Sequence, residues 1–334
     1  MPVPHPTAPS TPSEPSAPSE SSFDPEALLD VGRWLQSQHY QFTTPTPATH
    51  TLVLGRRAHA TASDLRDIFG WNLPFSQGLL PADILATMQH GGLVQSGEAG
   101  LLGTTVRFST LGSLIFPHSS FPTIHNESVF FGPDTYRFAA LIRRQLVASP
   151  LQDMSRVLDM GCGSGAGGLV AATHDRTVRP QLVLADISPL ALRCAQASAE
   201  LAGLTSVDLC QGDLFHSVAG EFDLVVANPP YLNDGAQRLY RHGGGRWGEA
   251  LSIRILREGY PRLSPGGRLV LYTGSSISHG VDHLLQAFEE ALKEFPCTWS
   301  YEELDPDVFG DELNNPAYTD VDRIAAVGLV VQKP

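Results

Sequence analysis

Short apolar runs alternate with amphipathic segments along the chain from about residue 156 onward. The apolar runs have the length of buried strands, whereas segments with an apolar position every three or four residues have the period of helices. Strands are expected to begin at Arg156 and to span 182–185, 207–210, 222–227, 267–272, 299–304 and 324–332, with helices over 189–202 and 281–295. This alternation predicts an α/β fold with a doubly wound, Rossmann-like, mostly parallel sheet. A ligand of such a sheet binds at the carboxyl ends of its strands.

The segment before residue 125 has a different pattern, with short helices followed by two strands. Asp24 and Pro25 have the chemistry of a helix start, and further helices are expected over 63–69 and 81–90. Strands are expected over 93–95 and 104–108. We therefore predict a small helical, winged-helix-like domain over 24–125 that recognises substrate or acts as a lid, followed by the α/β domain over 126–334. Its few basic residues disfavour DNA binding.

The first 22 residues are almost entirely Pro, Ser, Thr, Ala and Glu, which predicts a disordered tail. No basic start leads into an apolar run, so no signal peptide is expected, and no apolar run approaches the roughly 18 residues of a membrane span. The cysteines form no CxxC pair and no metal-type spacing, which predicts neither a zinc site nor a disulfide framework. Free cysteines favour a reducing, cytoplasmic location.

Two aromatic residues, Phe130 and Phe131, precede a Gly132-Pro133 turn and a helix expected over 136–148. Two interpretations of this stretch are open. It is either an element laid across the entrance of the α/β domain or an interdomain linker that contributes two aromatic rings to the core.

A glycine-rich turn follows the strand that begins at Arg156, in the order Gly161-Cys162-Gly163-Ser164-Gly165. Glycines let a ligand approach the backbone, and the following helix offers free N–H groups. The next strand ends in Asp186, which can accept from both ribose hydroxyls of an adenosine, and Asp213 can accept from an adenine amino group.

The same turn also fits GxGxxA, a dinucleotide fingerprint. However, Asp159 lies two residues before the first glycine, where its carboxylate would repel a pyrophosphate. It could instead help to hold an ammonium group, directly or through water. This arrangement favours a methyl donor with an amino-acid end over a dinucleotide.

The strand over 222–227 ends in Asn228-Pro229-Pro230-Tyr231. The prolines stop the strand, because neither can donate to a ladder. The Asn228 carboxamide oxygen can accept from an NH2 group, the carbonyl between the prolines can accept a second hydrogen bond, and Tyr231 can stack on a flat group. Such a tip suits methyl transfer to nitrogen. The alternative is a turn that only ends the strand.

With these motifs in place, the domain over 129–333 resembles the release factor glutamine methyltransferases, a family of class I S-adenosylmethionine-dependent methyltransferases. The resemblance implies a seven-stranded sheet with a final antiparallel strand and S-adenosyl-L-methionine as cofactor. It implies that the Gly161 and Gly163 backbone, Asp186 and Asp213 hold the cofactor, while Asn228 and Tyr231 hold the acceptor. Further cofactor contacts are expected from residues that adjoin these motifs, namely Phe131, Asp159, Cys162, Ile187, Leu214 and Asn228.

The chain departs from that family at two places. Gly132 stands before Pro133-Asp134-Thr135 where the family has an arginine, and the N-terminal domain is predicted to be winged-helix-like instead of a helical bundle. A basic group also follows Tyr231, and its members are Arg238, Arg241, His242, Arg246, Arg254 and Arg257. This basic group is either a solvated surface or a docking site for an acidic partner or RNA.

The favoured function is N-methylation of a protein glutamine, with a translation factor as a candidate partner. Alternatives are methylation of an RNA base amine (adenine N6 or guanine N2) and of a small molecule; a regulator that binds the cofactor without turnover is disfavoured by the intact acceptor motif. Acidic residues outnumber basic ones by 35 to 22, giving a net charge of −13. That charge opposes general electrostatic binding of nucleic acid.

Overall fold

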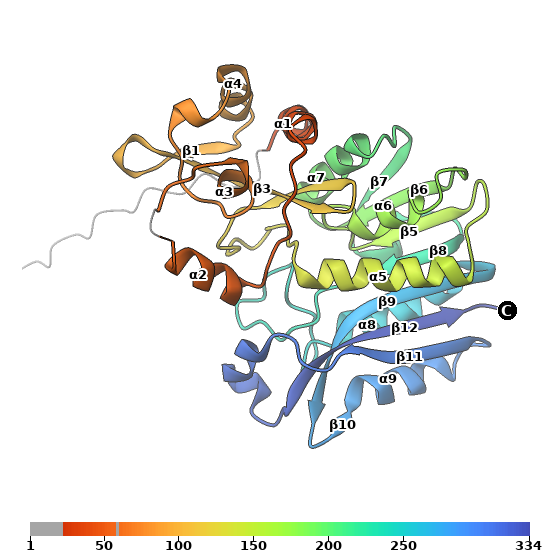
Figure 1. Cartoon of the computed structure of the whole chain (residues 1–334). Coiled ribbons are helices and arrows are strands. Elements are labelled where there is room, and N and C mark those ends of the chain that lie inside the picture. Colours follow the sequence, from red (N-terminus) through yellow and green to blue (C-terminus); the bar gives the residue numbers. More distant parts are fainter. Residues whose placement is uncertain (1–22, 58–59) are drawn as a thin grey trace, which may run out of the picture.

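The computed structural model describes residues 23–57 and 60–334 of the chain. The predicted disordered tail over 1–22 lies outside the described residues. A seven-stranded path of neighbouring strands dominates the molecule (Figure 1). In chain order these strands are β5 (Arg156–Met160), β6 (Gln181–Asp186), β7 (Val207–Gln211), β8 (Phe222–Ala227), β9 (Leu263–Ser278), β11 (Thr298–Asp305) and β12 (Arg323–Gln332).

The strands lie in the order β7-β6-β5-β8-β9-β12-β11, and the short β10 (Val281–Asp282) pairs with β9 off this path. Adjacent strands from β7 to β9 are parallel, whereas β12 is antiparallel to both of its neighbours. This topology confirms the predicted Rossmann-like sheet and its antiparallel last strand. The strand order reverses between β5 and β8, which is where such a sheet opens a crevice for ligand.

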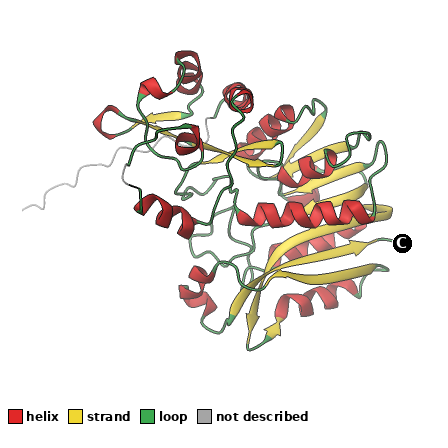
Figure 2. Ribbon diagram, in the orientation of Figure 1, coloured by secondary structure: helices red, strands yellow, loops and turns green. Residues whose placement is uncertain are grey.

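Helices cover both faces of the sheet (Figure 2). One face packs on α5 (Pro133–Ala148), α6 (Ala166–Ala172) and α7 (Pro189–Leu201), and the other packs on α8 (Ala250–Gly259) and α9 (His283–Leu292). The first layer buries Phe138 and Leu169 against Leu184, and the second buries Ile255 and Phe288. Strands covered on both faces are apolar throughout, which is why they could be identified from sequence.

Over the described residues 23–57 and 60–125, the N-terminal part has four α-helices and two hairpins. The helices are α1 (Pro25–Ser37), α2 (Pro47–Gly55), α3 (Leu65–Phe69) and α4 (Ala82–His90), and the strands are β1 (Val94–Ser96), β2 (Leu102–Thr104), β3 (Val106–Leu111) and β4 (Leu114–Ser119). The expectation of a single strand over 104–108 is wrong. Thr105 donates its backbone N–H to the Leu93 carbonyl and separates the β1–β2 hairpin from the β3–β4 hairpin.

The N-terminal elements pack directly on the α/β unit through α7. Leu28 and Val31 of α1 share a buried cluster with Leu190 and Cys194 of α7. Gln36 donates to the Leu201 carbonyl at 3.1 Å, which ties the ends of the two helices together. In Figure 1 the α1 helix lies beside α7. A separate domain over 24–125 therefore stays a prediction, since its core continues into the sheet unit.

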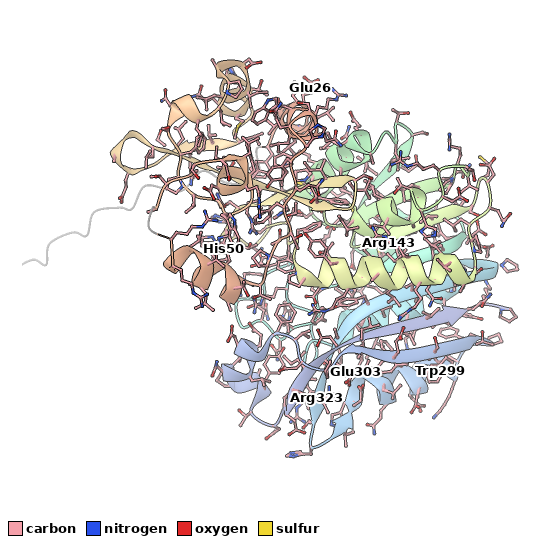
Figure 3. All side chains as sticks on the ribbon, in the orientation of Figure 1. Glu26, His50, Arg143, Trp299, Glu303 and Arg323 are labelled. Atoms are coloured by element: carbon pink, nitrogen blue, oxygen red, sulfur yellow. The ribbon has the colours of Figure 1, made fainter. Side chains whose placement is uncertain are left out.

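Figure 3 labels His50 in the N-terminal part and Glu303 and Arg323 on the last two strands of the sheet. His50 of α2 is 1% exposed and stacks on Phe121 with ring centroids 3.9 Å apart. Glu303 on β11 and Arg323 on β12 form an ion pair at 2.8 Å on the surface.

Within residues 23–57 and 60–334, no helix has the length and apolar character needed to cross a membrane.

Gly168→Ala tests the close contact between α6 and the sheet. A Cβ at Gly168 would lie 2.7 Å from Leu184 Cδ2 and 3.0 Å from Asp159 Cβ, and both of these residues are buried. Overpacking of this kind costs about 1–3 kcal/mol, which exceeds the roughly 1 kcal/mol that alanine gains over glycine in a helix. We expect a lower Tm in thermal unfolding. Gly55→Ala, at the open end of α2, is the matched control and should not lower Tm; equal stability of both variants would contradict the predicted contact.

Candidate functional site

A cavity of about 410 Å³ opens at the carboxyl ends of β5, β6 and β8. Every residue predicted to belong to the site lines it. These residues are Phe131, Asp159, Gly161, Cys162, Gly163, Asp186, Ile187, Asp213, Leu214, Asn228, Pro229, Pro230 and Tyr231. The structure thus brings the predicted residues together, and their individual roles stay predictions.

The glycine turn forms one wall of the cavity. Gly161 and Gly163 have φ of +69° and +53°, which few other residues adopt without strain. A Cβ on Gly161 would meet open space, so its backbone borders the cavity directly. Asp186 accepts the Gly163 N–H at Oδ2 and the Ser188 N–H at Oδ1, each at 2.9 Å. Each carboxylate oxygen keeps a lone pair for a further donor, as two vicinal hydroxyls would require.

Asp159 is a buried carboxyl at the other end of the same turn. It is 1% exposed and accepts the Gly168 N–H at 2.7 Å. Burial raises the pKa of Asp159 to about 7; the Gly168 N–H opposes that rise, and the nearby Asp186 charge adds to it. A cation placed beside Asp159 would relieve this unfavourable burial, which is the property expected of an ammonium site.

Asp213 lies at the far end of the cavity, and its side chain is about half exposed. Arg254 of α8 binds both carboxylate oxygens, with Nη1–Oδ1 at 3.3 Å and Nη2–Oδ2 at 3.1 Å. An adenine amino group would therefore share this carboxylate with Arg254. The next residue, Leu214, has φ of +46° and also lines the cavity.

The acceptor tip follows β8 directly. Pro229 is buried, while Asn228 is partly exposed to the cavity. Among the described residues, the Asn228 carboxamide has no hydrogen-bond partner, so it is available to a ligand. Gly243 and Gly248 pack against the backbone of Pro230 and Tyr231 so closely that a Cβ at either glycine would collide with it. The glycine-rich stretch after the acceptor motif therefore cradles the tip.

Tyr231 is held by a residue that sequence reasoning did not assign to the site. Its hydroxyl donates to Asp134 Oδ2 at 2.9 Å, and Tyr272 of β9 donates to Asp134 Oδ1 at 2.6 Å. Burial raises the pKa of Asp134, and the two hydroxyls and Arg137 oppose that rise. The sequence signals for Asp134 were its place in the Pro133-Asp134-Thr135 triplet, which matches a motif of the resembled family, and its position at the start of a helix.

Two segments meet over the cavity, and one of them contains the predicted entrance element. Leu239 donates its backbone N–H to the Asn126 carbonyl at 3.3 Å, and the Tyr240 hydroxyl donates to the Thr123 carbonyl at 2.7 Å. Phe131 is 1% exposed, lines the cavity and stacks on His118 at 5.3 Å. Phe131 is therefore both a core ring and part of the cavity wall.

The basic group after Tyr231 is largely neutralised by acidic residues, one from the same segment and the others from elsewhere in the chain. The ion pairs are Arg238–Asp234, Arg241–Glu312, Arg246–Asp320, Arg254–Asp213 and Arg257–Glu294. Glu312 and Asp320 come from the segment between β11 and β12. The structure therefore favours a solvated surface over a cationic docking site.

Over the described ranges 23–57 and 60–334, no group of three or more His, Cys, Asp or Glu side chains has a metal-binding arrangement.

Comparison with known proteins shows which families this chain resembles. Residues 139–293 match the family described as Methyltransferase small domain. A release factor glutamine methyltransferase of Xylella fastidiosa is 32% identical over 219 residues, which cover 60% of this chain and 73% of that protein. One from Borreliella burgdorferi is 28% identical over 169 residues, covering 45% of this chain and 58% of that protein.

A ribosomal RNA small subunit methyltransferase C of an Enterobacter species is also similar, with 35% identity over 117 residues. That match covers 32% of this chain and 33% of the relative. The chain thus spans little more than half of the Borreliella protein and a third of the ribosomal RNA methyltransferase.

Asp159→Asn should stabilise the protein more at pH 8 than at pH 5. The pKa of Asp159 is about 7 in the folded chain, against about 3.9 for Asp in an unfolded chain. Between these values the folded state holds a proton that the unfolded state has lost, so the contribution of Asp159 to wild-type stability falls as the pH rises and levels off above about 7. Asparagine does not titrate, and its oxygen can still accept the Gly168 N–H. The Tm difference between variant and wild type should grow by a few degrees over this range in circular dichroism; a constant difference would contradict the titration of Asp159.

Proposed function

The chain belongs to the family of class I S-adenosylmethionine-dependent methyltransferases that includes the release factor glutamine methyltransferases, and we propose that it methylates a planar amide or amine nitrogen. The favoured acceptor is a protein glutamine. The observation that carries this proposal is the unpartnered Asn228 carboxamide, which lines the same cavity as Asp159 and Asp186.

The residues of the cavity fit S-adenosylmethionine. Asp186 has free lone pairs for the ribose hydroxyls, the Gly161 backbone borders open space, and Asp159 would face the ammonium. Phe131, Ile187 and Leu214 supply apolar surface between these polar groups. When bound, S-adenosylmethionine supplies an electrophilic methyl group on its sulfonium.

The task of the chain's own residues is then to present nitrogen to that methyl group. Asn228 Oδ1 accepts one N–H of the acceptor, and the Pro229 carbonyl accepts the other. These two acceptors orient the nitrogen lone pair and increase the electron density on a weakly nucleophilic amide. Reacting atoms held about 3–3.5 Å apart gain a large part of the rate from orientation alone. The two segments that meet over the cavity would also limit the access of water to the acceptor.

Charge supports a protein acceptor over RNA. The arginines after Tyr231 are paired with acids, and the net charge is −13. Binding to a phosphate backbone needs unpaired cations that release counterions. Methylation of an RNA base amine remains the second candidate, because Asn-Pro-Pro-Tyr suits base amines as well as amides and because a ribosomal RNA methyltransferase is among the relatives.

Asn228→Ala should lower turnover by about 10²–10³, the scale for one preorganised polar contact, and should leave cofactor affinity close to that of the wild type. Turnover is measured as transfer of a tritiated methyl group from the cofactor to fractions of a bacterial lysate. Asn314→Ala, an exposed amide outside the cavity, is the control and should have wild-type turnover. Wild-type turnover of Asn228→Ala would exclude the acceptor role of this residue.

The acceptor class is identified by mass spectrometry of the methylated lysate. We expect the added methyl group on a glutamine side chain and only a shallow dependence of substrate binding on salt. A methylated base together with a steep salt dependence would establish the RNA alternative.

Asp186→Ala should weaken binding of S-adenosylmethionine by roughly 1.5–3 kcal/mol, the scale for hydrogen bonds to a charged group. Isothermal titration calorimetry measures the change. Asp208→Ala, an exposed acid on the neighbouring strand β7, is the matched control and should bind normally. If Asp186→Ala binds S-adenosylmethionine as tightly as the wild type, Asp186 does not bind the ribose.

A further inference from the structure

Asp134 is a buried carboxyl that connects three separate parts of the fold. It is 3% exposed and lies in the first turn of α5. Its two oxygens accept the hydroxyls of Tyr231, which follows the acceptor prolines, and of Tyr272 on β9. Arg137 of α5 lies 3.3 Å from Asp134 Oδ1 and also binds Asp305 at 2.7 Å. These contacts join α5, the acceptor tip and the β9 strand at a single point.

The ring of Tyr231 is enclosed as firmly as its hydroxyl. It is 7% exposed, packs edge-on against Tyr272 with centroids 6.4 Å apart, and contacts Phe309 at 5.9 Å. Gly274 provides the space for this ring, because a Cβ there would collide with it. With its hydroxyl turned to Asp134 and its ring packed, Tyr231 has one position in the structure.

The acceptor tip is consequently fixed at both of its ends. Ala227 is registered in the sheet between Met160 and Leu271, which fixes the backbone before Asn228. Tyr231 is fixed by Asp134 at the other end. The two prolines between them have a restricted φ, so little freedom remains for the Pro229 carbonyl.

We propose that Asp134 is a positioning residue that, together with Tyr272, locks Tyr231 and thereby aims the Asn228 carboxamide and the Pro229 carbonyl at the acceptor nitrogen. This inference rests on the proposed methyl transfer. A buried carboxylate is unfavourable unless it is fully hydrogen-bonded, and here each bond is made to a group that shapes the acceptor tip.

The experiment compares Asp134→Asn and Tyr272→Phe with a matched control, Tyr301→Phe. Tyr301 also donates to a carboxylate, Asp282 Oδ2 at 2.6 Å, but outside the cavity. In Asp134→Asn an NH2 group replaces one carboxylate oxygen and cannot accept the hydroxyl bound there, and phenylalanine at position 272 removes one donor from Asp134. We measure three quantities for each variant: cofactor affinity, turnover with the lysate fraction that the wild-type protein methylates, and hydrogen–deuterium exchange of the peptide over 228–236.

We expect turnover to fall about tenfold to a hundredfold in Asp134→Asn, the range produced by a small misplacement, and less in Tyr272→Phe. Cofactor affinity should stay within twofold of the wild type, and exchange over 228–236 should become faster in both variants. Tyr301→Phe should lose comparable stability while its turnover and its exchange in this peptide stay unchanged.

The proposal is overturned if Asp134→Asn or Tyr272→Phe behaves like Tyr301→Phe in both turnover and exchange. If Asp134→Asn does not fold, Tyr272→Phe decides. A wild-type protein that transfers no methyl group to any fraction would refute the proposed function, and the exchange of the acceptor peptide would still decide whether Asp134 fixes it.

Discussion

Two carboxyls are held within the protein at neighbouring strand ends by backbone N–H groups, and the organisation of the cavity depends on them. Asp159 at the end of β5 accepts from Gly168, and Asp186 at the end of β6 accepts from Gly163 and Ser188. Burying negative charge is unfavourable unless donors compensate it. Gly163 donates from a turn with positive φ, which residues with side chains rarely adopt, whereas Gly168 donates from within α6 and Ser188 from the N-cap of α7. The Gly168 N–H opposes the rise in pKa that burial causes at Asp159 without cancelling it, and the glycine turn leaves backbone exposed to a ligand.

The acceptor side of the cavity is built on a different principle. At the acceptor motif the backbone is held in place by packing and hydrogen bonds from several elements. The sheet fixes the residue before Asn228, Gly243 and Gly248 pack on the backbone of the tip, and Asp134 binds the Tyr231 hydroxyl. A mobile amide would spend little time in the geometry that methyl transfer needs, so the rigidity of this tip matters as much as its chemistry.

The sheet could be predicted from the sequence because buried parallel strands are apolar throughout. The site residues could be predicted because polar residues stand at the ends of these strands, and the structure places those ends around one cavity. It failed where the signal lies in tertiary pairing. The β3–β4 hairpin was missed, since its strands carry buried polar residues such as Arg107 and His118 in place of an apolar run. Asp134 and Tyr231 are 97 positions apart, and Arg241 and Glu312 are 71 apart. No local pattern indicates that such distant residues are partners.

The segment between β11 and β12 has a consequence for how this fold can diversify. It provides Glu312 and Asp320 to Arg241 and Arg246, and Phe309 to the cavity wall. The two acids thus neutralise arginines of the same chain that would otherwise be free to bind an anionic partner. A homologous fold with a shorter connection between the same two strands would display those arginines uncovered beside the same reaction centre. A change in the length of one loop would then be enough to alter which kind of macromolecule approaches an otherwise unaltered catalytic apparatus.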